Sequence, residues 1–215
     1  MVQADDLRHV FWLGGSPCAG KSSVAEILAA RFRLRLYRVD EAFEAHSRRF
    51  DPERHPALTS WRDSGWDARW MRPVESLVRE VEACYGEHFT LILEDVLSMP
   101  KGEPLLVEGS ALLPGRVANV LADRGRALWL VPTEEFQRER YPKRGWVRGI
   151  LEQCGSPEAA FDNWMARDAA FARRVESEAA GLGLESLRVD GKHSIEETAA
   201  EVASHFGLSD GLLHI

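Results

Sequence analysis

Eight residues near the start of the chain have the types and spacing of a phosphate-binding loop. The segment Gly15-Ser16-Pro17-Cys18-Ala19-Gly20-Lys21-Ser22 fits the pattern G-x-x-x-x-G-K-[ST]. Glycines let a backbone curl so that successive N–H groups face a phosphate, and a following helix adds the positive end of its dipole. Lys21 is expected to reach the β- and γ-phosphates, and the Ser22 hydroxyl to hold Mg²⁺. The sequence therefore predicts a nucleoside triphosphate site, with ATP and Mg²⁺ as cofactors.

The flanking residues favour this interpretation over a glycine-rich turn before an ordinary helix. Residues 9–13 form an apolar run typical of a buried strand, and Val24, Ile27 and Leu28 recur at helical spacing. Strand, loop and helix is the arrangement that the motif requires. For Cys18 a role as a small packing residue is the preferred alternative to a reactive thiol. The residues expected to contact the nucleotide here are Gly15, Cys18, Ala19, Gly20, Lys21, Ser22 and Ser23.

Composition limits the class of protein. The chain has 215 residues, enough for one α/β domain with a sizeable core, and its net charge is −7 with no long basic run. A nucleic-acid surface is therefore not indicated for the molecule as a whole. Three widely spaced cysteines argue against a disulfide framework and against a zinc site. The chain shows no signal peptide and no stretch of transmembrane length, so we expect a cytoplasmic protein without a membrane partner.

Strands and helices alternate along the chain. The pattern predicts strands over about 9–13, 34–39, 104–109, 126–131 and 185–189, and helices over 41–49, 74–96, 116–123, 161–175 and 194–206. The 74–96 segment reads as one long helix or as two joined near Gly86. Residues 51–66 read as a loop and 133–148 as basic and irregular, while 208–215 are unassigned. This alternation is typical of a parallel sheet with helices on both faces.

The chain resembles the P-loop small-molecule kinases, a group that includes nucleoside monophosphate kinases, shikimate and gluconate kinases and chloramphenicol phosphotransferase. The phosphate loop is the specific match. Weaker matches are Val39-Asp40, Leu106-Val107-Glu108-Gly109, the arginine-bearing segment after strand four, and Val189-Asp190-Gly191. The resemblance implies one three-layer P-loop domain over 1–215, with sheet order 2-3-1-4-5. It also implies an acceptor-binding region at about 41–70, a lid at about 133–150, and ATP-dependent phosphorylation of a hydroxyl or phosphate on a small molecule.

Two acids follow predicted strands at the edge where open α/β sheets bind ligands. Asp40 can accept the proton of an attacking hydroxyl or orient the substrate, and the alternative is a helix N-cap. Glu108 stands where many P-loop proteins place an Asp that helps to hold Mg²⁺. Glu108 could reach the water shell of the metal or bind a substrate hydroxyl. Its alternative is an exposed acid at the end of a strand.

The segment after strand four is rich in cations: Arg138, Arg140, Lys143, Arg144 and Arg148. In the resembling kinases this segment is the lid, whose arginines close over the triphosphate. Guanidinium groups suit phosphate oxygens, and we expect Arg138 and Arg144 to act in catalysis. The alternative is a solvated basic face, which is also the preferred interpretation of Arg167 and Arg173. The resemblance further places Gly191 in a turn that borders the adenine base.

Tryptophans gather between the second strand and the long helix. Trp61 and Trp66 lie among charged residues in the segment that covers the acceptor in the resembling kinases. Indoles stack on ring systems and sugar faces, so we expect at least one of the two to line the acceptor pocket beside Asp40. The acceptor would then be bulky and hydroxylated, such as a nucleoside, an aminoglycoside or another natural product. Packing of the helix onto the sheet is the alternative.

Other functions remain open at this point. A GTPase-like switch would need an N-K-x-D stretch after strand four, and residues 131–134 read Val-Pro-Thr-Glu instead. A kinase-like toxin or a nucleic-acid end kinase is a further alternative, and the acidic balance of the chain weakens the nucleic-acid version. The sequence leaves the acceptor and the oligomeric state undetermined.

Overall fold

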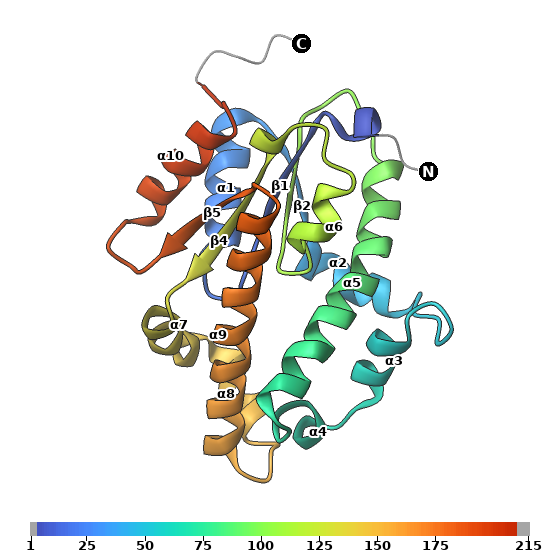
Figure 1. The fold of residues 1–215 in the computed structure, drawn as a ribbon, viewed down its shortest axis with the longest axis vertical. Coiled ribbons are helices and arrows are strands. Elements are labelled where there is room, and N and C mark those ends of the chain that lie inside the picture. Colours follow the sequence, from blue (N-terminus) through green and yellow to red (C-terminus); the bar gives the residue numbers. More distant parts are fainter. Residues whose placement is uncertain (1–3, 210–215) are drawn as a thin grey trace.

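Five parallel strands form one sheet, as the sequence predicts. The computed structural model describes residues 4–209 of the chain (Figure 1). The strands are β1 Val10–Gly15, β2 Arg35–Arg38, β3 Leu105–Glu108, β4 Ala127–Pro132 and β5 Glu185–Val189. Their order is β2-β3-β1-β4-β5, which confirms the α/β fold class and the strand order 2-3-1-4-5. Every residue of β1, β3 and β4 is buried, because these central strands are covered on both faces.

Two apolar layers hold helices against the sheet. On one face α1 (Lys21–Phe32) and α10 (Ile195–His205) pack on side chains such as Leu13 and Leu130. On the other face α5 (Val74–Ser98), α6 (Pro114–Ala118) and α9 (Pro157–Gly181) cover Trp12 and Trp129. The Trp129 indole N–H donates to the carbonyl of Leu112 at 2.7 Å, so the largest core ring is also oriented by a hydrogen bond.

The remaining helices lie beyond the carboxyl ends of the strands. They are α2 (Val39–Ser47), α3 (Pro56–Asp63), α4 (Trp66–Trp70), α7 (Glu134–Arg140) and α8 (Gly145–Leu151), with the 3₁₀ turn Tyr141–Lys143, whereas the 3₁₀ turns Ala4–Leu7 and Arg124–Arg126 precede β1 and β4. Figure 1 shows α3, α4, α7 and α8 grouped with the ends of α5 and α9, away from both termini. The sheet and these helices therefore meet at the edge where ligands bind in α/β proteins.

The structure corrects two segments. Residues 51–66 were predicted to be a loop, yet they contain α3, because Pro56 occupies the first helical turn, where proline needs no N–H partner. Residues 133–148 were predicted to be irregular, yet they form α7, a 3₁₀ turn and α8. Thr133 begins α7 by accepting a hydrogen bond from the N–H of Phe136 at 3.3 Å. The division into an acceptor region and a lid remains a prediction.

Other boundaries differ less. Helix α5 is continuous through Gly86, which is buried and lies close to Arg116. Helix α2 begins at Val39 rather than at 41, so Asp40 lies in its first turn. Helix α6 ends at Ala118, five residues before the predicted end. The unassigned tail extends past residue 209 and so lies mostly outside the described residues.

Gly15 tests how tightly the phosphate loop is fixed to the sheet. Its φ is +124°, and a Cβ added there would stand 2.0 Å from the Leu130 carbonyl oxygen. We expect Gly15→Ala to lower the free energy of unfolding by about 2 kcal/mol or more, through overpacking and backbone strain. Gly149→Ala is the matched control, because no atom lies within 4 Å of its added Cβ inside α8. Urea unfolding measures the difference, and we expect a lower midpoint for Gly15→Ala than for Gly149→Ala. Equal midpoints would show that Gly15 is only a turn residue.

Candidate functional site

The loop between β1 and α1 has the backbone of an anion site. Cys18 and Gly20 adopt left-handed conformations with φ of 67° and 79°. Gly20 is the N-cap of α1 and has no side chain, so the first N–H groups of the helix are left without a side-chain cap. The N–H of Ser16 donates to the Leu130 carbonyl at 3.1 Å and fixes the loop on β4. This geometry is the one that a bound phosphate requires.

Cys18 packs rather than reacts. Its side chain belongs to an apolar cluster with Trp70, Tyr141 and Trp164. Burial raises the pKa of the thiol, and only part of this rise is offset by the nearby Arg144. The thiol therefore stays protonated at neutral pH, in agreement with the preferred sequence interpretation.

Lys21 lies inside the loop. Its ammonium group donates to the Ser16 carbonyl at 2.8 Å and to the Ser110 hydroxyl at 3.1 Å. Burial lowers the pKa of Lys21, and the carboxylates of Asp40 and Glu108 counteract part of that shift. The loop thus contains a buried cation between a backbone carbonyl, a hydroxyl and two nearby acids, where a triphosphate would add further negative charge.

Glu108 and Asp40 bring two carboxylates to the same edge. In the sheet register Glu108 pairs with Leu13 on one side and with Arg38 on the other, so it lies between the ends of β1 and β2. Glu108 is only 2% exposed, which excludes the exposed-acid alternative. The N-cap of α2 is Arg38, so Asp40 does not serve as the cap either. Both acids act on the Lys21 ammonium electrostatically and therefore lie near the phosphate loop.

The oxygen atoms at this edge suit Mg²⁺. Burial raises the pKa of Glu108, while Lys21 and a hydrogen bond from the Ser22 hydroxyl oppose the rise. A hydroxyl and a carboxylate are hard ligands, and Mg²⁺ usually completes its shell with phosphates and water. Within residues 4–209 no cluster of three or more His, Cys, Asp or Glu side chains could form a metal cage. Ser22 and Glu108 therefore fit a nucleotide-bound cation rather than an all-protein metal site.

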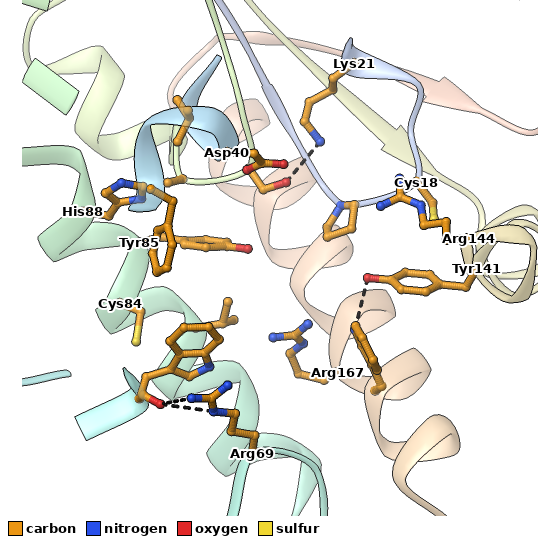
Figure 2. Close-up of a pocket in the computed structure, with 18 of the residues that line it drawn as sticks. Cys18, Lys21, Asp40, Arg69, Cys84, Tyr85, His88, Tyr141, Arg144 and Arg167 are labelled. Carbon is orange, nitrogen blue, oxygen red and sulfur yellow. Dashed lines mark hydrogen bonds between the residues drawn. The ribbon is translucent and has the colours of Figure 1, made fainter. Parts of the chain in front are cut away.

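A cavity of about 500 Å³ extends from the phosphate loop toward α4, α5 and α9. Figure 2 shows Lys21 and Asp40 at one end and Arg69, Cys84 and Arg167 at the other. A volume in this range is typical of a site for a small molecule. The aromatic residues on its wall are Phe43, Trp61, Trp66, Trp70, Tyr85, Tyr141, Trp146 and Trp164.

The two predicted acceptor tryptophans line this cavity and also hold a cation. The Arg69 guanidinium lies 4.1 Å from the ring centroid of Trp61 and 4.6 Å from that of Trp66. Its N–H groups donate to the Trp61 carbonyl at 2.8 and 3.1 Å. The Trp66 indole N–H donates to Gln153 at 2.9 Å. Trp61 and Trp66 thus line the cavity, and their contact with an acceptor remains a prediction.

The predicted lid and adenine residues are not all brought together. Arg144 lines the cavity, with its guanidinium 5.5 Å from the ring centroid of Tyr141. Arg138 instead pairs with Asp162 and is not among the residues that line the cavity. Gly191 lies on a separate cavity of about 80 Å³ beside β5. The catalytic role of Arg138 and the adenine contact of Gly191 remain predictions that this arrangement does not favour.

A group of cavity residues on α9 and η3 (Tyr141–Lys143) was missed. Trp70 stacks on Trp164 with ring centroids 4.0 Å apart, and the Tyr141 hydroxyl donates to Asp168 at 2.8 Å. The Arg167 guanidinium pairs with Asp168 at 2.5 Å. One signal was present in the sequence, because Asp168 occupies an otherwise apolar stripe of its helix and is 1% exposed. A buried acid at such a position needs partners, and these partners line the cavity.

A second polar network ties α2 to α5 behind the cavity. His46 bridges His88 and Asp95, with 2.8 Å between nitrogen atoms on one side and 2.8 Å from nitrogen to oxygen on the other. Tyr37 and Arg49 also donate to Asp95, at 2.9 Å each. Burial and the neighbouring His46 lower the pKa of His88 to about 3, so His88 is neutral at physiological pH. His88 lines the cavity, and His46 lies two turns along α2 from Asp40.

Comparisons with known proteins add no family. No protein-family model matches the chain, and no curated protein matches its sequence. One similar solved structure is a putative kinase from Chloroflexus aurantiacus, at 17% identity and a TM-score of 0.40, covering 91% of this chain and 97% of that one. Another is the YorR protein from Bacillus subtilis in complex with phosphorylated GDP, at 15% identity and a TM-score of 0.43, covering 91% and 94%. At these scores the fold assignment rests on the strand order and phosphate loop of this chain itself. Among the described helices, none has the length and apolar character needed to cross a membrane.

Glu108 should reduce the stability of the protein without ligand. Because burial raises its folded pKa, the folded state loses stability as pH rises from the unfolded value of about 4.5 through the raised value. We expect Glu108→Gln to raise the free energy of unfolding at pH 7 by about 1 kcal/mol. The gain should vanish near pH 4, where the carboxyl is protonated in both states. Urea titrations at the two pH values measure the difference. A gain of equal size at both would contradict the electrostatic explanation.

Proposed function

We propose that this chain is an ATP-dependent phosphotransferase that transfers the γ-phosphoryl group to a hydroxyl or phosphate of a small molecule. The observation that carries the proposal is the shared cavity: the phosphate loop with Lys21 forms one end of it, and Asp40 lies beside them on the same wall. A switch protein needs a nucleotide site alone, whereas a phosphotransferase also needs space for an acceptor next to the γ-phosphate. The aromatic part of the cavity supplies such a space.

The residues divide the reaction between them. The loop N–H groups and Lys21 hold the β- and γ-phosphates, and Lys21 meets the negative charge of the transferring group. Asp40 accepts the proton of the acceptor hydroxyl as its oxygen attacks phosphorus, and the bond from phosphorus to the ADP oxygen breaks. Arg144, which lines the same cavity, would add positive charge beside the transferring phosphoryl group. Bound Mg²⁺, held by Ser22 and Glu108, would neutralise charge on the phosphate oxygens.

ATP is proposed as the donor because the guanine-reading N-K-x-D stretch is missing after β4. Thermal melting with Mg²⁺ and either ATP or GTP tests this choice. A ligand at 100 times its Kd stabilises a protein by about 2.7 kcal/mol, which is readily measured as a rise in melting temperature. A larger rise with GTP at equal concentration would favour the switch over the phosphotransferase.

Lys21→Ala should abolish ATP turnover while the fold persists. Its ammonium group is the buried cation of the loop, and its loss leaves the γ-phosphate without a fixed counter-charge. We expect ADP release to fall at least 100-fold and the melting temperature without nucleotide to stay within a few degrees. Lys101→Ala is the control, because Lys101 is an exposed lysine paired with Asp6. Wild-type turnover in Lys21→Ala would remove the proposal.

Asp40→Asn should lower turnover far more than nucleotide affinity. A base that acts on the acceptor need not contact the nucleotide, and loss of general base catalysis typically costs about 10²- to 10⁴-fold. Calorimetric titration with a non-hydrolysable ATP analogue and Mg²⁺ gives the affinity, and ADP release gives the rate. Glu41→Gln is the matched control, an exposed acid one position along α2 that pairs with Arg38. If affinity collapses while turnover per bound nucleotide survives, Asp40 belongs to the metal shell instead.

A further inference from the structure

One corner of the cavity is built from hydrogen-bond donors on α4, α5 and α9. We call Trp70, Tyr85 and Arg167 the donor corner. The Arg167 guanidinium lies 4.8 Å from the Trp70 ring centroid, and its side chain is 12% exposed. Figure 2 shows it extending from α9 into the space between Tyr85 and Tyr141. A cation this deep in an aromatic wall requires partners.

The protein supplies only part of what Arg167 needs. One carboxylate oxygen of Asp168 pairs with the guanidinium at 2.5 Å, and the other accepts a hydrogen bond from the Tyr141 hydroxyl at 2.8 Å. Tyr141 in turn accepts the indole N–H of Trp164 at 3.1 Å. Asp168 is therefore fully engaged, and it fixes Arg167 in place without satisfying the rest of the guanidinium fork.

Two buried donors in this corner have no partner. Among the described residues, the Nε of Arg167 and the indole Nε1 of Trp70 are buried without a hydrogen bond. An unpaired buried donor costs about 1–3 kcal/mol, and proteins rarely keep one without a reason. Two such atoms on residues in contact indicate that an oxygen-bearing group completes the corner.

No cavity acid is free to do so. Asp40 and Glu108 lie at the phosphate loop, and Glu80 pairs with Arg72. Tyr85 adds another hydroxyl to the same space, and burial raises its pKa, so it stays a donor. The corner thus offers three donors, one of them charged, and none of its three residues carries a carboxylate.

We infer that the donor corner binds an anionic oxygen group, a carboxylate or a phosphate, carried by an acceptor with an aromatic or other flat body. The inference rests on the proposed function, because it names the end of the acceptor that is not phosphorylated. A planar guanidinium fork matches two anionic oxygens, and the surrounding rings match a flat body. Both unpaired N–H groups are covered in the present arrangement, so binding includes a small side-chain rotation. Polycationic acceptors such as aminoglycosides would meet Arg167 unfavourably.

Three probes that share a phenyl ring test the head group: phenylacetate, phenyl phosphate and phenethylamine. Their binding is followed by ligand-observed NMR on the full chain, with the phosphate loop saturated by a non-hydrolysable ATP analogue and Mg²⁺. We expect at least one anion to bind about tenfold more tightly than the amine. The tighter of the two anions then identifies the source, carboxylate or phosphate. Equal affinity for all three probes would overturn the inference.

Substitutions on α9 test whether Arg167 causes the preference for the anionic probes. Arg167→Gln should remove the tenfold preference, whereas Arg174→Gln should keep it, because Arg174 lies two turns along α9 in exposed pairs with Glu75 and Glu82. If Arg167→Gln fails to fold, Arg167→Lys decides: it keeps the charge but loses the fork, and the preference should fall at least threefold. An unchanged preference in the folded Arg167 variant would place the anion elsewhere.

The same probes separate this inference from the proposed function. Lys21→Ala removes the phosphoryl-transfer cation but leaves the donor corner intact, so its preference for the anion should persist without bound nucleotide. If the wild-type protein prefers the anionic probes but shows no ATP turnover, the anion site is retained and the phosphotransferase is rejected. If the wild-type protein turns over ATP but binds all three probes equally, the phosphotransferase is retained and the anion site is rejected.

Discussion

The buried charge of Lys21 is the constraint around which the rest of the site is built. An ammonium group inside a protein is stable only where oxygens surround it, and here they come from the loop, from Ser110 and, at longer range, from Asp40 and Glu108. These groups belong to three separate segments, which lie at the carboxyl ends of β1, β2 and β3. They converge because the parallel sheet places the ends of β1, β2 and β3 side by side. The fold and the charge cluster therefore depend on each other. The parallel sheet brings the acids to Lys21, and the Lys21 ammonium offsets their negative charge at the sheet edge.

That cluster also explains why the molecule extends beyond its sheet. In the proposed reaction, a cation between two acids would hold the reacting phosphate in one place, and an acceptor would then approach from a fixed direction. The ends of α5 and α9, with the short helices around them, form a wall on that side (Figure 1). The wall is mostly aromatic. Two of its charged members, Arg69 and Arg167, are held between or against rings rather than in open water.

Local patterns in the sequence were enough for the sheet and the phosphate loop. Continuous apolar runs mark β1, β3 and β4, and the phosphate-loop motif consists of consecutive residues, so both can be recognised without knowing the fold. The helices beyond the sheet were harder, because α3, α7 and α8 are short and polar on much of their surface. Their stability comes from packing with residues far along the chain. Pro56 and Gly145 look like helix breakers until the first turn of a helix is found to begin at them.

The cavity wall was the least accessible part for the same reason. Trp70 meets Trp164 across 94 positions of sequence, and no periodic pattern predicts such a pair. Arg167 was predicted to belong to a solvated basic face, and this prediction was wrong, because its side chain is largely buried against Trp70 and Asp168. Only Asp168, an acid in an apolar stripe, carried a signal for this side of the site. Arg138 shows the opposite error, since membership in a basic cluster did not place it near the cavity.

The tie between His46, His88 and Asp95 has a mechanical consequence. Helix α2 carries Asp40 near its beginning and His46 near its end, and the second of these is bonded to α5. Asp40 therefore lies on a short helix whose other end is hydrogen-bonded to α5, and α5 forms part of the cavity wall. The position of the Asp40 carboxylate is in this way tied to the position of α5. Under the proposed function, an acceptor that packs against α5 would touch the same helix that anchors the helix carrying Asp40.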